Sequence, residues 1–241
     1  MPGTVVLLHG FAGTRRAWDA VVEQLEAESY TALAPDIRGH GESSSLRPIT
    51  FDACSRDVLD LAPERFDLCG YSMGGRLALH MALAAPGRVR RLVLVSTTAG
   101  IDHHAERAAR RTADRTLADE LERGTIAQFA ERWLAQPLFA ADGPASQSLA
   151  REDILRNGPH DLSAALRGIG AGEMAPLWQR LGELRETEVV VVVGERDVKF
   201  AAIGERLAQA IPGARLVTIE GAGHALPREA PAPLAAVIAD R

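Results

Sequence analysis

Apolar residues gather in short continuous runs rather than in alternating patterns. Four runs are strong, at 4–10, 91–97, 188–194 and 214–220, and two are weaker, at 30–36 and 66–72. Continuous apolar runs of this length are typical of parallel strands that are buried on both faces. We therefore predict a strand at each of these six places.

Helical periodicity fills most of the gaps between the runs. Helices are expected at 16–28, 51–62, 73–85, 200–210 and 231–240. Strands that alternate with helices indicate an α/β fold, in which helices flank a mostly parallel, twisted sheet.

The alternation breaks once, over about 90 residues between the runs at 91–97 and 188–194. This segment has no convincing strand, and its pattern predicts amphipathic helices at 103–123, 125–135, 146–156, 161–167 and 173–184. It has too few large apolar residues for a rich core of its own. We expect residues 1–98 and 187–241 to form the core and residues 99–186 to form a helical lid, inserted before the penultimate strand.

Charge and composition exclude several classes of function. The 241 residues suit one α/β domain, and a net charge of −5 without a basic block argues against nucleic-acid binding. No apolar run approaches the roughly 18 residues of a membrane span. The start of the chain resembles no signal peptide, so a cytoplasmic protein is expected, with Cys54 and Cys69 as buried thiols. We expect no metal, no cofactor, no membrane or nucleic-acid partner, and a monomer or small homo-oligomer.

The segment GYSMG, residues 70–74, is the strongest chemical signal. A serine between glycines, after an apolar strand and before a helix, is the pattern of a nucleophile elbow. The glycines allow a sharp turn that side chains would obstruct, and the turn exposes the Ser72 hydroxyl. The backbone N–H of Met73 begins the following helix, where negative charge is stabilised.

A second glycine-rich turn, HGFAG at 9–13, follows the first strong strand. We assign a second oxyanion-stabilising donor to the backbone N–H of Phe11. His9 has two interpretations: it contacts ligand, or it packs and forms hydrogen bonds beneath the loop.

The partners of the serine are expected at later strand ends, where open α/β sheets gather their sites. Asp197 follows the run at 188–194, and His224 follows the run at 214–220. We predict the triad Ser72–Asp197–His224. Glu195 and Asp36 are the rival acids.

The motifs LHGFAG, GYSMGG, GERD and GAGH resemble the α/β-hydrolase superfamily over essentially the whole chain. A narrower resemblance rests on GYSMGGRLAL (70–79), GERDVKF (194–200) and long segments of the lid. It is to the 2-succinyl-6-hydroxy-2,4-cyclohexadiene-1-carboxylate synthase (MenH) family of menaquinone biosynthesis. That family implies a substrate with several carboxylates and a triad that acts as a base, with elimination of pyruvate.

The resemblance also implies substrate-binding positions. These are Arg76, Arg110, Arg156, Trp133 and Tyr71, to which His9 is added. Guanidinium groups bind carboxylates in two places at once, so three of them suit a polycarboxylate. Taken alone, each lid arginine is more typical of a solvent-exposed helix face, and Trp133 of a lid core.

The chain departs from the family at HALPREAP, residues 224–231, which leaves open a changed substrate preference. It also lacks room for an N-terminal hairpin, so the sheet is expected to have fewer than eight strands. The predicted function is a lyase of menaquinone biosynthesis. The alternatives are a serine carboxylesterase that forms an acyl-serine and, from another class, a small-molecule-binding protein on the same fold.

Overall fold

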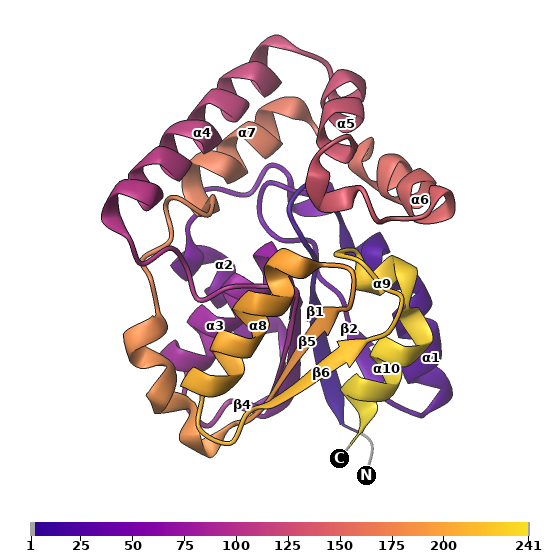
Figure 1. Cartoon of the computed structure of the whole chain (residues 1–241), viewed down its shortest axis with the longest axis vertical. Coiled ribbons are helices and arrows are strands. Elements are labelled where there is room, and N and C mark those ends of the chain that lie inside the picture. The colour runs from indigo at the N-terminus through magenta and orange to yellow at the C-terminus, as the bar shows by residue number, and fades with distance from the viewer. Residues whose placement is uncertain (1–2, 241) are drawn as a thin grey trace.

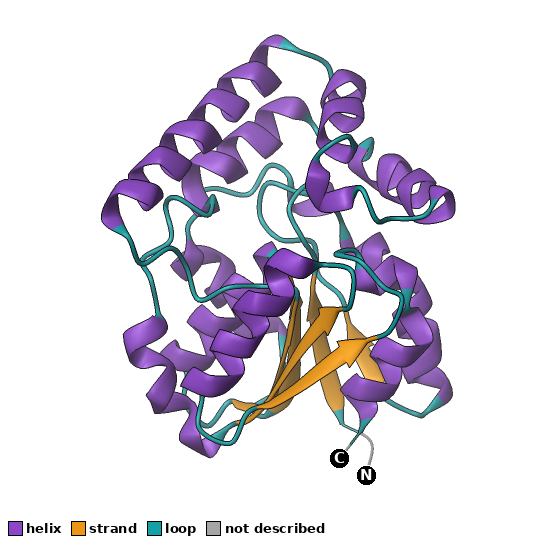
Figure 2. Cartoon of the chain, in the orientation of Figure 1, coloured by secondary structure: helices purple, strands orange, loops and turns teal. Residues whose placement is uncertain are grey.

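Six parallel strands form one sheet at the centre of the computed structural model, which describes residues 3–240 (Figures 1 and 2). The strands are β1 (Thr4–Leu8), β2 (Thr31–Leu33), β3 (Phe66–Tyr71), β4 (Val89–Val95), β5 (Glu188–Gly194) and β6 (Arg215–Ile219). Their order across the sheet is β2-β1-β3-β4-β5-β6. All six predicted strands are confirmed.

Helices cover both faces of the sheet, which explains why the strands are continuously apolar. Val5 and Leu7 pack with α1 (Asp19–Ala27) and α10 (Pro231–Ala239) on one face. Val6 and Leu8 point to the opposite face, as the two-residue period of a strand requires. There the core includes residues of α2 (Phe51–Leu61), α3 (Met73–Ala84) and α8 (Val198–Ala210).

A helical insertion lies between β4 and β5, so the predicted place of the insertion is confirmed. Its helices are α4 (His104–Arg123), α5 (Ile126–Leu134), α6 (Pro144–Ile154) and α7 (Pro159–Ile169), with a 3₁₀ turn at Pro137–Phe139. In Figure 1, α4 lies beside α7 and α5 beside α6, above the upper edge of the sheet. Its buried cluster includes Leu121, Phe129 and Leu162 together with Ala12 of the core, so the insertion packs onto the loop after β1.

One expected helix, at 173–184, is wrong. Residues 173–177 are irregular, and a 3₁₀ helix runs from Trp178 to Glu186. Pro176 explains the break, because it has no backbone N–H and disfavours helical geometry at the residue before it. Leu177, Leu181 and Leu184 of this segment still reach the main core.

Both cysteines are free and buried, as expected. Burial raises the pKa of the Cys54 thiol to about 11 and also raises that of Cys69, so neither is a thiolate at neutral pH. Of the helices described, none combines the length and apolarity needed to cross a membrane.

Candidate active site

Ser72 lies in a strained turn between β3 and α3. Its φ of 52° and ψ of −109° are unfavourable for a residue with a side chain. The glycines permit the turn: a Cβ on Gly70 would lie 2.4 Å from the carbonyl oxygen of Gly74, and one on Gly74 would lie 2.1 Å from that of Leu8. The Ser72 carbonyl oxygen accepts a hydrogen bond from the Thr97 hydroxyl at 2.7 Å. The surroundings therefore hold the serine at the end of the strand.

Asp197, His224 and Ser72 lie in hydrogen-bonding order. His224 Nδ1 is 2.6 Å from Asp197 Oδ2, and His224 Nε2 is 3.4 Å from Ser72 Oγ. An ionised carboxylate only accepts hydrogen bonds, so the His224 proton belongs on Nδ1 and leaves Nε2 free to accept the serine proton. Both Asp197 and His224 are buried. This arrangement can serve a nucleophile or a base, and its catalytic role stays a prediction.

The two rival acids have other partners. Asp36 accepts hydrogen bonds from the backbone N–H groups of Arg15 and Glu42. Glu195 is exposed and accepts one from the Gly221 N–H. Asp197 alone of the three carboxylates lies beside His224.

Aromatic rings surround His224 on several sides. The ring centroids of Phe200, Tyr71 and Phe139 lie 4.6, 5.4 and 6.0 Å from that of the imidazole. Burial raises the pKa of Tyr71, so its phenol stays protonated. These rings limit the access of water to the histidine, which strengthens its bond to Asp197.

Phe11 and Met73 both line the cavity beside Ser72, as required of the proposed oxyanion donors. His9 does not line it. Its Nε2 accepts from the Ile37 N–H at 2.9 Å, and its Nδ1 lies 2.8 Å from the Gly10 carbonyl oxygen. Burial lowers the pKa of His9, which is consistent with a neutral ring. Of the two interpretations of His9, the structure fits packing beneath the loop.

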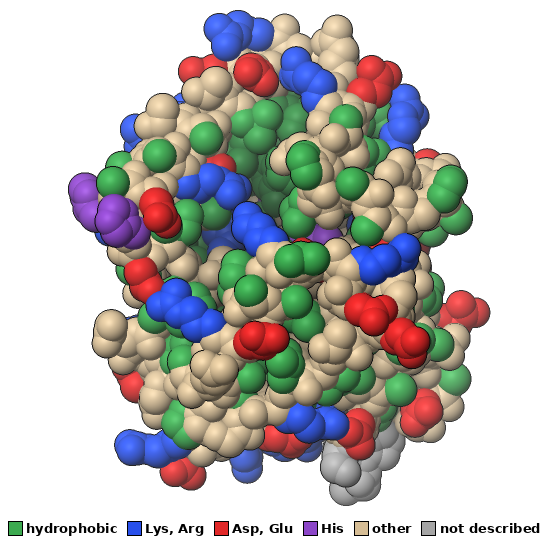
Figure 3. Space-filling model, in the orientation of Figure 1, with side chains coloured by type: hydrophobic (Ala, Val, Ile, Leu, Met, Phe, Trp, Pro, Cys, Tyr) green, Lys and Arg blue, Asp and Glu red, His purple; other side chains and the backbone are tan. Residues whose placement is uncertain are grey.

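A cavity of about 600 Å³ lies between the helical insertion and the carboxyl ends of the strands. Figure 3 shows a hollow at this place with hydrophobic side chains inside and Lys or Arg side chains around it. Trp133 and Tyr71, which are predicted to bind substrate, line the cavity. The centroid of the Trp133 ring lies 5.2 Å from that of Phe11 and 5.9 Å from that of Phe139, so Trp133 connects the insertion to the loop after β1.

Two of the three predicted arginines line this cavity. Arg76 is 8% exposed and donates from NH1 to the Ile169 carbonyl oxygen at 2.9 Å. Burial lowers its pKa to about 10, so it remains a cation at neutral pH. Arg110 donates from Nε to buried Asp114 at 2.7 Å, which orients the guanidinium.

Arg156 departs from the expectation, because its side chain is exposed and does not line the cavity. The neighbouring Asn157 is the buried residue of this turn. Its side-chain amide donates to the Ala12 carbonyl oxygen, and its oxygen accepts from the Gly41 N–H, both at 2.9 Å. Burying Asn157 in this way directs Arg156 to solvent.

Two cations of α8 line the cavity and were not predicted: Lys199 and Arg206. Arg206 pairs with Asp102, and its guanidinium lies 3.6 Å above the Trp178 ring. Lys199 is the one lysine of the sequence and stands two residues after Asp197, and Arg206 is seven residues further on the same helix face. The seven-residue spacing of these two cations, about two helical turns, is the sequence feature that places them on one face of α8. Within residues 3–240, no group of three His, Cys, Asp or Glu is arranged to hold a metal ion.

A pair of carboxyl groups lies behind His224. Glu229 accepts from the N–H groups of Gly223 and Ala225, at 2.9 and 3.0 Å, and so holds both neighbours of the histidine. Asp142 of the insertion is also buried there. A Cβ on Gly223 would lie 3.1 Å from Glu229 Oε1 and 3.2 Å from Asp142 Oδ1, so the two carboxyl groups converge. Burial and the nearby Glu229 raise the pKa of Asp142 to about 7.

Asp142 is expected to make the protein less stable as pH rises from about 4 to about 7. In that range the folded state keeps a proton that the unfolded chain releases, so folding is penalised increasingly, and the penalty is complete above pH 7. Asp142→Asn cannot ionise. Its melting temperature relative to the wild type should therefore rise by roughly 5 °C between pH 5 and pH 8. Asp60→Asn, at an exposed position of α2, is the control and should show a flat difference. A flat difference for Asp142→Asn would contradict the raised pKa.

Comparison with known proteins shows the family to which the chain belongs. The family model described as "Alpha/beta hydrolase family" matches residues 5–237. A Bacillus subtilis (strain 168) protein provisionally named 2-succinyl-6-hydroxy-2,4-cyclohexadiene-1-carboxylate synthase is 36% identical, over 94% of this chain and 85% of its own.

Two solved structures have the same architecture. MenH from S. aureus superposes with a TM-score of 0.92 and is 32% identical, covering 98% of this chain and 91% of its own. A thermophilic esterase from Thermogutta terrifontis, with malate bound, has a TM-score of 0.87 and 28% identity, covering 99% of this chain and 88% of its own.

Proposed function

Because this chain belongs to the alpha/beta hydrolase family, we propose that it is the lyase of that fold which acts in menaquinone biosynthesis. The reaction is elimination of pyruvate from 2-succinyl-5-enolpyruvyl-6-hydroxy-3-cyclohexene-1-carboxylate. Relatives named for the corresponding synthase are 30% to 36% identical over nearly the whole chain. The observation that carries the proposal is the presence of Arg76 and Arg110 in one cavity with Ser72.

Two cations that line the cavity, Arg76 and Lys199, suit a substrate with several carboxylates. Arg76 is buried without a carboxylate within ion-pair distance, among the residues described, and Lys199 likewise has none. A buried cation is costly unless an anion compensates it, and a guanidinium binds a carboxylate through two parallel hydrogen bonds. A neutral acyl chain would leave Arg76 without an anion in contact, since the nearby Asp114 is paired with Arg110. The proposed substrate has three carboxylates, and its binding would offset this cost.

The proposed mechanism uses the triad as a relay of one proton. His224, oriented by Asp197, takes the hydroxyl proton of Ser72, and the serine oxygen removes a proton from a ring carbon of the substrate. Electrons of that C–H bond form an enolate, whose oxygen is stabilised by the N–H groups of Phe11 and Met73. The C–O bond to the enolpyruvyl group then breaks. The leaving oxygen takes a proton from His224 and departs as the enol of pyruvate.

Release of pyruvate tests the proposal directly. The purified protein, given the enolpyruvyl substrate and a lactate dehydrogenase coupling system, is expected to produce one pyruvate per substrate far faster than a sample without enzyme. Turnover of a neutral nitrophenyl ester should be much slower. If Ser72 reacts with a fluorophosphonate probe but pyruvate appears only at the enzyme-free rate, the triad is competent and the proposed substrate is wrong.

A carboxylesterase is the second candidate, because the cavity also has a large apolar lining. Phe11, Leu138, Phe139, Ile101 and Ile203 all contribute to it. The T. terrifontis esterase, at 28% identity, supports this alternative. An esterase would pass through an acyl-serine at Ser72. Mass spectrometry of protein quenched during turnover would detect a substrate-derived acyl group on Ser72 for the esterase and none for the lyase.

A further inference from the structure

The loop that carries Phe11 forms a tight turn in a strained conformation. The Gly13 N–H donates to the Gly10 carbonyl oxygen at 3.2 Å, so Phe11 and Ala12 are the central residues of the turn. Ala12 has a φ of 63°, in the left-handed region that residues with a Cβ rarely occupy. Such a conformation persists only when its surroundings hold it.

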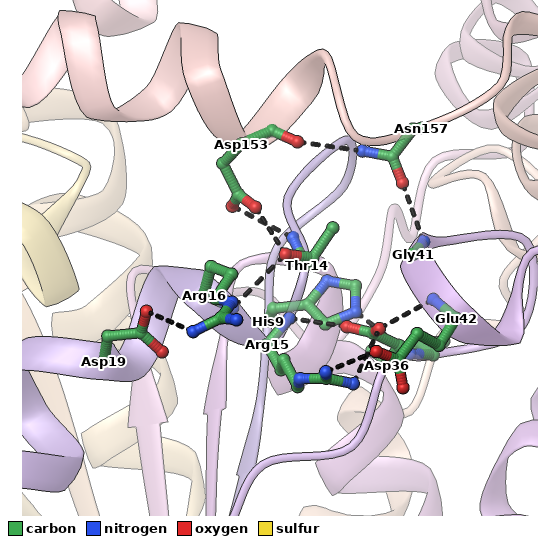
Figure 4. A network of polar contacts seen from close by, with 11 residues as sticks. His9, Thr14, Arg15, Arg16, Asp19, Asp36, Gly41, Glu42, Asp153 and Asn157 are labelled. Atoms are coloured by element: carbon green, nitrogen blue, oxygen red, sulfur yellow. Dashed lines mark hydrogen bonds and ion pairs between the residues drawn. The ribbon is translucent and has the colours of Figure 1, made fainter.

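Asp153, in the last turn of α6, binds the residue that follows the turn. Its Oδ2 accepts from the Thr14 N–H at 3.0 Å, and its Oδ1 accepts from the Thr14 hydroxyl (Figure 4). Asp153 is 3% exposed. A buried carboxylate that accepts such bonds is held strongly, because breaking them would leave its charge uncompensated.

Asn157, four residues later, binds the turn itself. Its Nδ2 donates to the Ala12 carbonyl oxygen at 2.9 Å, and its Oδ1 accepts from the Gly41 N–H at 2.9 Å. Figure 4 shows Asp153 and Asn157 reaching from the same end of the helical insertion toward the loops of the core. The strained residue is thus contacted by a side chain of the insertion.

Asp153 has a further partner in the segment that follows His224. Arg228 of α9 (Leu226–Glu229) donates from NH2 to Asp153 Oδ2 at 2.7 Å, four residues after His224. This guanidinium compensates the carboxylate, so that Asp153 can lie near an oxyanion site without opposing negative charge there. The Asp153 carboxylate therefore connects the residue after the turn 10–13 to the segment that follows His224.

We propose that Asp153 and Asn157 are positioning residues for the oxyanion hole, which hold the turn 10–13 so that the Phe11 N–H points at the developing negative charge. The helical insertion is then part of the catalytic centre and not only its cover. The inference rests on the proposed role of the Phe11 N–H, and it applies to elimination and ester hydrolysis alike.

The rate of phosphonylation of Ser72 by a fluorophosphonate probe tests this without the natural substrate, because the phosphonyl oxygen uses the same donors. Losing one oxyanion donor lowers rates by about 10²- to 10³-fold. Asp153→Asn and Asn157→Asp, which each exchange one side-chain group, are expected to slow the reaction about 10- to 100-fold. The same variants should lower kcat for pyruvate release by a similar factor, with KM changed less than about threefold.

Variants of Thr14 test whether Asp153 acts by holding the turn or through its ion pair with Arg228. Thr14→Val removes the hydroxyl bond to Asp153 but leaves the bond from the Thr14 backbone N–H and the Asp153–Arg228 pair. It should slow phosphonylation, whereas Thr14→Ser, which keeps a hydroxyl, should react at the wild-type rate. In the double variant with Asp153→Asn the two losses should not multiply. If Arg228→Met is as slow as Asp153→Asn while Thr14→Val reacts at the wild-type rate, Asp153 acts through Arg228 and the proposal is overturned.

Ser163→Ala is the matched control within the insertion. Its hydroxyl, fully buried in α7, donates to Glu122 of α4 at 2.6 Å, away from the turn. It should lose stability without losing the rate of phosphonylation. An equal slowing in Ser163→Ala would mean that any loosening of the insertion suffices, which would overturn the specific role of α6. Absence of pyruvate release with an intact phosphonylation series would contradict the proposed substrate and leave this inference standing.

Discussion

Ser72→Ala is expected to lower kcat for pyruvate release by about 10⁴-fold or more, because the serine oxygen is the atom that removes the substrate proton. The backbone bonds that hold the turn, from Ser72 N–H to the Val95 oxygen and from the Arg76 N–H to the Ser72 oxygen, do not involve the hydroxyl. Substrate binding and melting temperature should therefore change little. Coupled pyruvate assays and isothermal titration with the substrate measure the two quantities.

His224→Ala, alone and combined with Ser72→Ala, tests whether the two residues act together. If Ser72 and His224 act as one proton relay, the double variant should be no slower than about the slower single variant, since groups that act as a unit give losses that do not multiply. Losses that multiply would indicate that Ser72 and His224 act independently of each other, and the relay would have to be abandoned.

Arg76→Met is expected to reduce kcat/KM for pyruvate release by about 10²- to 10³-fold, because truncating one partner of a desolvated charge pair costs about 2–5 kcal/mol. Methionine keeps the aliphatic bulk at this buried position but removes the charge and the hydrogen bond to Ile169. Hydrolysis of a neutral nitrophenyl ester should fall less than about tenfold. Equal losses for the charged and neutral substrates would contradict carboxylate binding by Arg76.

Two variants of α4 provide the comparison. Arg110→Ala should also weaken turnover of the charged substrate selectively, although less, since Arg110 is half exposed and already paired with Asp114. Arg115 is on the same helix, pairs with Glu173 and does not line the cavity. Arg115→Ala should leave both reactions unchanged, which controls for the loss of a positive charge from the insertion.

The fold could be predicted because its strands are buried on both faces. Exposing a continuous apolar run such as that of β5 to water is unfavourable, so the run is stable only between two layers of helices. Few other folds are compatible with such a sequence. The positions of Ser72, Asp197 and His224 are predictable for the same reason: each stands shortly after the end of a recognisable strand, and parallel strands bring their carboxyl ends to one edge.

Side-chain direction within the insertion could not be predicted in the same way. Arg156 and Asn157 are neighbours in a turn, and the direction of each depends on which one finds buried partners in a distant loop. Lys199 and Arg206 lie on one face of α8, but periodicity does not say that this face borders a cavity. The apolar spacing at 173–184 predicts a helix, but Pro176 breaks it, because proline lacks the backbone N–H that a helix needs.

Tryptophan placement gives this protein an intrinsic optical probe. Of its three tryptophans, Trp18 is fully buried in the core, whereas Trp133 and Trp178 line the cavity from the insertion and from the segment before β5. An indole beneath a guanidinium, as at Trp178, and an indole packed among phenyl rings, as at Trp133, experience different electric fields. An anion that enters between them perturbs both fields, so ligand titrations can be followed by native fluorescence without attaching a label.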